Sequence, residues 1–180
     1  MRKNLCVYCG ASERLDDVYR QAAITLGTLI GKNNLGLVYG GGRLGLMGLV
    51  ANAVLENGGK VTGFTTQLLD EREGAHPGLT ELHVVDSMHT RKLKMSEHAD
   101  AFIILPGGFG TLDELFEIIT WRQLNIHKKP IIVLNINKYW DPLVNLINQV
   151  IRERFAQSSH LSLITVLEKP EEVFEVLKQR

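Results

Sequence analysis

The sequence contains few of the features that would identify a membrane, secreted or nucleic-acid-binding protein. Its 180 residues include only two cysteines, and no apolar run approaches the length needed to cross a bilayer. Lys plus Arg and Asp plus Glu number 20 each, so no excess of positive charge favours nucleic acid. Met1-Arg2-Lys3 leads directly into an apolar segment rather than a signal peptide. These absences predict a cytoplasmic protein with no membrane or nucleic-acid partner.

The sequence also lacks a pattern typical of metal or redox chemistry. Cys6 and Cys9 form one C-x-x-C pair, but a structural zinc site needs further ligands. A redox pair usually opens a helix, whereas this pair lies at the end of a predicted strand. The six histidines show no metal-like spacing. We therefore expect buried, unreactive thiols and neither a metal ion nor an organic cofactor.

Short apolar segments alternate with helical patterns along the whole chain. Segments without polar alternation are typical of strands covered on both faces, and their alternation with helices predicts one doubly wound, Rossmann-like parallel α/β domain over residues 1–180. Residues 65–80, which carry glycine, proline and charge, are predicted to form a long loop. The predicted strands are 5–8, 35–39, 60–64, 82–85, 101–105, 130–135 and 163–166, and the predicted helices are 16–30, 46–57, 88–98, 111–123, 140–155 and 170–178.

Two glycine turns each follow a predicted strand and precede a predicted helix. Gly40-Gly41-Gly42-Arg43-Leu44-Gly45 fits G-x-G-x-x-G, but the next strand ends in Gly63-Phe64-Thr65-Thr66 without the acid that a dinucleotide site requires. A nicotinamide oxidoreductase is therefore disfavoured. The second turn lies in Pro106-Gly107-Gly108-Phe109-Gly110-Thr111-Leu112-Asp113-Glu114. Backbone N–H groups at a helix start bind anions, so two such turns favour one nucleotide-sized ligand between them.

Charged residues beside these turns have two possible interpretations. Thr111 and Glu114 fit a T-x-x-E capping box, so Glu114 could cap a helix, serve catalysis, or do both. Arg91, Lys92 and Lys94 stand in the first turns of a helix that starts near Ser87, where cations oppose the helix dipole. Either these three residues form a solvated basic face, or Arg91 binds an anionic ligand.

Taken together, the second glycine turn, the Gly40–Gly48 segment and Met88-His89-Thr90-Arg91-Lys92 resemble the LOG ("Lonely Guy") family. Its members are cytokinin riboside 5′-monophosphate phosphoribohydrolases, formerly described as possible lysine decarboxylases. The resemblance implies a homodimer that hydrolyses the N-glycosidic bond of a nucleoside 5′-monophosphate without a cofactor. Its catalytic pair falls on Arg91 and Glu114. Nucleotide contacts, together with the glycine turns, fall on Glu73, Arg91, Lys92, Gly41, Gly42, Gly107, Gly108, Phe109, Gly110, Thr111, Leu112, Asp113, Glu114 and Thr120.

The implied chemistry agrees with the residue types. Breaking an N-glycosidic bond builds positive charge on the ribose, and a carboxylate such as Glu114 can stabilise that charge or activate water. Arg91 can hold a phosphate or fix the carboxylate. Family members often have Ser at Arg43 and Tyr at Phe109, so base preference stays open between isopentenyl-adenine, adenine and others. A non-catalytic nucleotide-binding protein of the same fold is the alternative.

Overall fold

The computed structural model describes residues 3–178, and its strands form one seven-stranded sheet in the order β4-β3-β2-β1-β5-β6-β7. Every pairing in the sheet is parallel. The chain winds outward from β1 in one direction and then returns to start again at β5, so the order reverses between β1 and β5. The predicted doubly wound fold is confirmed. The strands are β1 (Asn4–Tyr8), β2 (Gly36–Tyr39), β3 (Lys60–Thr66), β4 (Glu81–Val85), β5 (Ala101–Ile104), β6 (Ile131–Leu134) and β7 (Thr165–Leu167).

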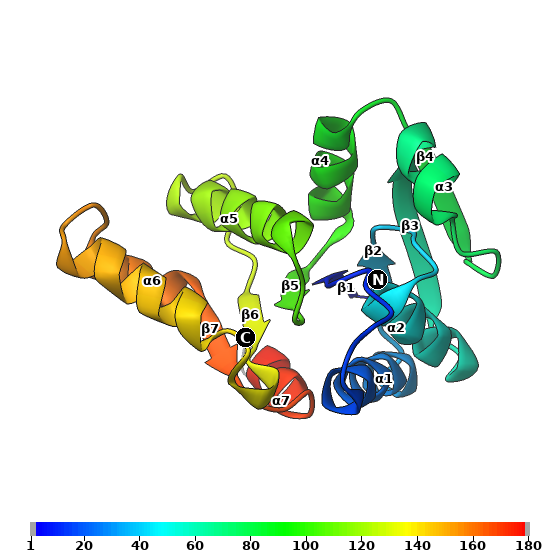
Figure 1. Ribbon diagram of the computed structural model, residues 1–180, viewed down its shortest axis with the longest axis horizontal. Helices are drawn as coiled ribbons and strands as arrows, with labels where there is room; N and C mark the ends of the chain where they lie inside the picture. The colour runs from blue at the N-terminus through cyan, green and yellow to red at the C-terminus, as the bar shows by residue number, and fades with distance from the viewer. Residues whose placement is uncertain (1–2, 179–180) are drawn as a thin grey trace.

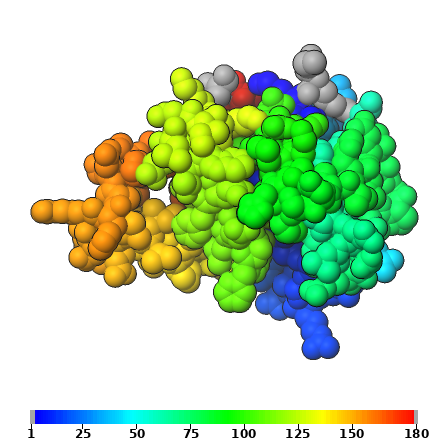
Figure 2. Space-filling view, turned by 90° about the horizontal axis from the view of Figure 1, so that it is seen from above, coloured from blue at the N-terminus to red at the C-terminus, as the bar shows by residue number. Residues whose placement is uncertain are grey.

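Helices cover both faces of the sheet (Figure 1). Helices α1, α2 and α7 pack on one face, and α4, α5 and α6 pack on the other. Figure 2 looks onto the second face, where α4 and α5 lie side by side in green. The helices are α1 (Asp17–Lys32), α2 (Gly45–Glu56), α3 (Gln67–Glu73), α4 (Met88–His98), α5 (Phe109–Gln123), α6 (Asp141–Arg152) and α7 (Glu172–Lys178), with 3-10 turns η1 (Ile136–Lys138) and η2 (Ser158–Leu163).

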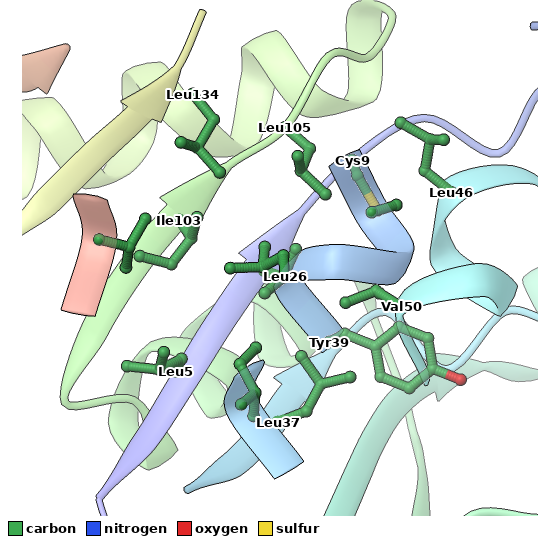
Figure 3. Close-up of a cluster of buried hydrophobic side chains, with 14 of the residues drawn as sticks. Leu5, Cys9, Leu26, Leu37, Tyr39, Leu46, Val50, Ile103, Leu105 and Leu134 are labelled. Carbon is green, nitrogen blue, oxygen red and sulfur yellow. The ribbon is translucent and has the colours of Figure 1, made fainter. Parts of the chain in front are cut away.

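The alternation of side chains along each buried strand produces two separate cores. In β1, Leu5 and Val7 point to the α1/α2 face, and Cys6 and Tyr8 point to the α4/α5 face. Figure 3 shows the first core, which contains Leu26 of α1 together with strand residues such as Leu5 and Leu37. Full burial of one such side chain stabilises the fold by about 1.5–3 kcal/mol. Continuous apolar strands are therefore required here, because both faces are covered.

The prediction of a loop over residues 65–80 was wrong in its first half. Strand β3 continues to Thr66, and α3 follows directly, with the Thr66 side chain accepting a hydrogen bond from Leu69 N at 3.3 Å. Helix α3 has seven residues and buries none of them, so it carries no apolar periodicity that sequence could reveal. The remaining helix and strand boundaries shift by a few residues, and α6 ends at Arg152 rather than near residue 155.

Both thiols are free and buried, as predicted, and burial raises the pKa of Cys6 and of Cys9 far above the usual range. Across residues 3–178, no three His, Cys, Asp or Glu side chains are grouped so that they could hold a metal ion. Over the same residues, no helix combines the length and apolar character that crossing a membrane requires.

Candidate active site

Three loops meet at the carboxyl ends of the strands, where the strand order reverses. The loop after β1 contacts the loop after β5 through Gly10 N, which donates to Pro106 O at 3.0 Å. The Gly10 carbonyl accepts a hydrogen bond from Leu46 N of α2, also at 3.0 Å. A pocket of about 260 Å³ opens beside these loops. Reversal points at the carboxyl ends of parallel strands are the usual ligand sites of such sheets.

A second cavity, of about 680 Å³, lies at the opposite, amino-terminal edge of the sheet. Its lining includes Lys3, Leu5, Lys129 and Phe174, and none of the residues predicted for the site. The smaller pocket is the better candidate despite its size, because it contains the buried ionisable groups and the helix amino terminus that nucleotide chemistry needs.

Arg91 is fixed in the wall of the pocket by two partners. Its side chain is only 7% exposed. Nε donates to the Phe64 carbonyl at the end of β3 at 2.9 Å, and Nη1 donates to Glu114 Oε1 at 3.1 Å. A Cβ added at Gly40 would overlap Arg91 Nη2, so the bare backbone after β2 makes room for the guanidinium. Arg91 is therefore not part of a solvated basic face.

Glu114 is not a helix cap. Helix α5 begins at Phe109 with Gly108 as its N-cap, so Thr111 lies inside the first turn and no side chain caps this end. The Glu114 side chain is 12% exposed and pairs with Arg91. Burial raises the pKa of Glu114 from 4.5 to about 7, although the Arg91 charge acts in the opposite direction. A carboxyl group that titrates near neutral pH is suited to proton transfer.

Lys92 and Lys94 have partners of their own. Lys92 Nζ lies 3.0 Å from Asp113 Oδ2 and 3.1 Å from Glu117 Oε1, and its side chain is 9% exposed. Lys94 is exposed and pairs with Glu97 at 2.9 Å. Acidic residues of α5 thus balance Arg91 and Lys92, whereas Lys94 pairs within α4, and Lys92 links the two helices that carry Arg91 and Glu114.

Two glycines of the second turn are not explained by the packing of the chain itself. A Cβ at Gly108 or Gly110 would have no atom within 4 Å, and the φ of Gly108 is −95°, which any residue adopts. By contrast, Gly41 has a φ of +80°, and a Cβ at Gly107 would overlap the Thr111 side chain. Gly108 and Gly110 line the pocket, so their missing side chains leave space for a ligand.

Comparison with known proteins shows to which family the chain belongs. The family model described as "Possible lysine decarboxylase" matches residues 47–177. Cytokinin riboside 5′-monophosphate phosphoribohydrolase LOG1 of Arabidopsis thaliana is 42% identical over 98% of this chain and 83% of its own length. The enzyme of the same description from Rhodococcoides fascians is 46% identical over 91% of this chain and 83% of its own length. The chain belongs to the LOG family.

Solved structures show that the fold of this LOG-family chain is shared more widely. The molybdenum cofactor binding protein of Rippkaea orientalis superposes with a TM-score of 0.75 at 20% identity, covering 99% of this chain and 97% of its own. The molybdenum cofactor carrier protein of Chlamydomonas reinhardtii gives 0.73 at 15% identity, covering 99% and 98%. At these identities the likeness concerns the fold alone.

The structure brings about half of the predicted site residues of this LOG-family chain into one pocket. Phe109 is 92% exposed and Leu112 packs against the second core, so neither lines it. Thr120 lies farther along α5, where its hydroxyl donates to Phe116 O at 2.8 Å. Gly41, Gly42, Lys92 and Gly107 do not line it either. The predicted residues that do line it are Glu73, Arg91, Gly108, Gly110, Thr111, Asp113 and Glu114.

Sequence reasoning missed the remaining lining of the pocket. Cys9, Gly10 and Ala11 contribute from the loop after β1, and apolar side chains come from α2, α3 and α4. Gly10 after a strand was a signal of the same kind as the other glycine turns. The apolar residues Met47, Leu69 and Met88 carried no such signal, because an apolar side chain by itself does not distinguish the lining of a pocket from ordinary packing.

Proposed function

We propose that this chain is a phosphoribohydrolase that cleaves the N-glycosidic bond of a nucleoside 5′-monophosphate to a free base and ribose 5-phosphate. The observation that carries the proposal is the buried Arg91–Glu114 pair, which stands beside the open backbone of Gly108 at the start of α5. Support also comes from the relatives, whose names describe this reaction at 42% and 46% identity.

Glu114 and Arg91 would share the chemical work. Cleavage of the bond to the base leaves positive charge on the ribose, which a nearby carboxylate stabilises. With its pKa near 7, Glu114 can also take a proton from the attacking water at neutral pH. Arg91, which is itself held by the Phe64 carbonyl, keeps Glu114 in one orientation. Its positive charge also lowers the pKa of Glu114 and so opposes the effect of burial.

The start of α5 is where the 5′-phosphate would bind. The first N–H groups of a helix lack partners inside the helix, and the helix dipole adds positive potential at that end. Gly108 and Gly110 allow a phosphate to approach this backbone, since neither carries a side chain that would occupy the space. The phosphate would then anchor the ribose next to Glu114, which lies on the same helix.

The pocket also fits a base with an apolar substituent. Met47, Leu69 and Met88 supply apolar lining in the same pocket as the charged pair, and the two methionines are flexible. This composition suits an adenine whose amino group carries an isoprenoid chain, as in a cytokinin nucleotide. Adenosine monophosphate, which lacks that chain, would bury less apolar surface and should be a poorer substrate.

The protein would act in the cytoplasm as a homodimer. Large apolar side chains remain uncovered at both ends of α5, with Phe109 92%, Leu124 61% and Ile126 64% exposed. Trp121, predicted with Leu124 and Ile126 to form an interface, is half-buried. Exposed apolar patches of this kind usually mark contact surfaces. A monomeric mass by light scattering at micromolar concentration would contradict the dimer.

The direct test is base release from matched pairs of substrates. Isopentenyladenosine and its 5′-monophosphate, and adenosine with AMP, ADP and ATP, are incubated with the protein and free base is followed by chromatography. We expect turnover of the monophosphates, a large loss with the nucleosides, and little reaction with di- and triphosphates. Equal kcat/KM for nucleoside and monophosphate would disprove the phosphate site. Binding of monophosphates without any base release would favour the non-catalytic alternative.

A further inference from the structure

One side chain outside the pocket, that of Tyr139, forms a hydrogen bond with the second glycine turn. The Tyr139 hydroxyl donates a hydrogen bond of 2.6 Å to the Gly107 carbonyl. Tyr139 follows β6, the strand next to β5, and does not line the pocket. It is 40% exposed, so burial of its ring does not by itself explain a tyrosine at this position.

The segment that carries Tyr139 is held in an uncommon conformation. Asn137 and Lys138 have φ angles of 50° and 62°, in the left-handed region that non-glycine residues rarely adopt. The buried Asn135 closes this turn, because its Oδ1 accepts from Trp140 N at 2.6 Å and its Nδ2 donates to Asp141 Oδ1 at 2.7 Å. The turn therefore fixes Tyr139 in one position relative to β6.

Aromatic contacts fix the ring of Tyr139 as well. It meets Trp140 edge-on at a centroid distance of 4.8 Å and Tyr19 of α1 edge-on at 5.8 Å. Tyr19 and Trp140 thus determine where the Tyr139 hydroxyl lies, and the hydroxyl determines where the Gly107 carbonyl points.

The orientation of that carbonyl sets the orientation of the next N–H. No cis peptide occurs in residues 3–178, and in a trans peptide the C=O and N–H bonds point in opposite directions. With the Gly107 carbonyl on Tyr139, the Gly108 N–H points away from Tyr139. In the described part of the chain, no backbone group accepts a hydrogen bond from this N–H. A peptide between two glycines turns over easily, since no Cβ hinders it.

We infer that Tyr139 is a positioning residue that holds the Gly107–Gly108 peptide with its N–H available to the phosphate of the substrate. Tyr139 can have this role only if the phosphate site of the proposed function exists. Without the hydroxyl, the peptide would spend part of its time turned over, with the Gly107 carbonyl oxygen in place of the N–H. A carbonyl oxygen facing an anion is repulsive, so phosphate binding should weaken.

The test compares Tyr139→Phe with the matched control Tyr19→Phe. Both changes remove one hydroxyl and keep the ring, but only the first removes the hydrogen bond to Gly107. The loss of one such bond predicts that the Kd for ribose 5-phosphate and the KM for the nucleotide rise about three- to tenfold in Tyr139→Phe. The value of kcat should change less, and Tyr19→Phe should behave like the wild type.

A resonance of the peptide itself gives an independent measurement. In ¹⁵N-labelled wild-type protein, the Gly108 amide resonance should move on addition of inorganic phosphate or ribose 5-phosphate, and this movement should shrink in Tyr139→Phe. Thermal melting confirms that each variant is folded before it is compared.

The outcomes separate this role from the proposed function. If the wild type releases base and Tyr139→Phe matches it in KM, Kd and the Gly108 resonance, the role of Tyr139 is wrong and the function stands. If the wild type binds ribose 5-phosphate but releases no base, the function is wrong, and the two Kd values still decide the role of Tyr139. An equal loss in Tyr19→Phe would show that the effect does not depend on the hydrogen bond to Gly107 and would refute the role of Tyr139, and no binding by the wild type would overturn both.

Discussion

Replacing Glu114 by Gln should remove catalysis and flatten the dependence of stability on pH. Gln keeps the size of the side chain and can still accept the hydrogen bond from Arg91 Nη1, which is 3.1 Å long in the wild type. It cannot carry the negative charge that stabilises the ribose cation, so we expect kcat to fall by about 100-fold or more. The matched control is Glu117→Gln, one turn farther along α5, which should retain most activity.

The effect on stability follows from the raised pKa of Glu114. Because the pKa rises from 4.5 to about 7 on folding, the native state holds the proton more tightly than the unfolded chain does. The free energy of unfolding therefore decreases as pH rises from about 4.5 to about 7, and this contribution amounts to about 2–3 kcal/mol between about pH 5 and about pH 8. The glutamine of Glu114→Gln does not titrate in this pH range. The free energy of unfolding of the variant should therefore lack this contribution to its decrease with pH.

Urea unfolding at the two pH values, at one protein concentration, measures this difference directly. Other groups titrate in both proteins, so their contributions cancel when the two pH dependences are subtracted. Parallel pH dependences for the wild type and Glu114→Gln would show that Glu114 titrates as an ordinary carboxyl group. In that case the explanation by burial would be wrong, whatever the activity of the variant.

Four other tests concern the site, one by pH and three by substitution. The pH profile of kcat/KM should rise through about pH 7, because the carboxylate form of Glu114 is the active one, and a flat profile between about pH 5 and pH 7 would contradict that role. Arg91→Met should lower kcat by about 100-fold or more and move the midpoint of any remaining profile upward, since Arg91 lowers the pKa of Glu114; an unchanged midpoint would separate the two residues. Gly40→Ala should abolish activity, because its Cβ would displace the Arg91 guanidinium, while circular dichroism should show intact secondary structure. Gly108→Ala should melt like the wild type, because its Cβ meets no other atom, and yet bind ribose 5-phosphate more weakly. Normal activity in Gly40→Ala, or normal binding in Gly108→Ala, would refute the corresponding steric argument.

The sequence by itself determined the sheet and, within residues 3–178, every α-helix except α3, and it predicted a site at the glycine turns. Apolar runs such as residues 101–105 have a length and composition that only a doubly covered strand tolerates, so local pattern sufficed. Glycine turns after two of these strands predicted a phosphate site at the carboxyl edge of the sheet, and the structure places Gly108 and Gly110 in the pocket there. The resemblance to the family also indicated Arg91 and Glu114 as a pair. It did so without any information about the distance between the two side chains. Helix α3 escaped detection because it buries no residue.

The tertiary structure alone decided the surroundings and the partner of Glu114. In the sequence, Thr111 and Glu114 fit a capping box, and the outcome depends on whether the helix starts at Phe109 or three residues later. Arg91 lies 23 positions earlier, and no periodicity links the two residues. They meet because α4 and α5 pack side by side on one face of the sheet, which follows from the reversal of strand order between β1 and β5. The same packing buries the pair, and this burial raises the pKa of Glu114. Burial depends on distant parts of the chain that pack around the pair, so the local sequence does not reveal it.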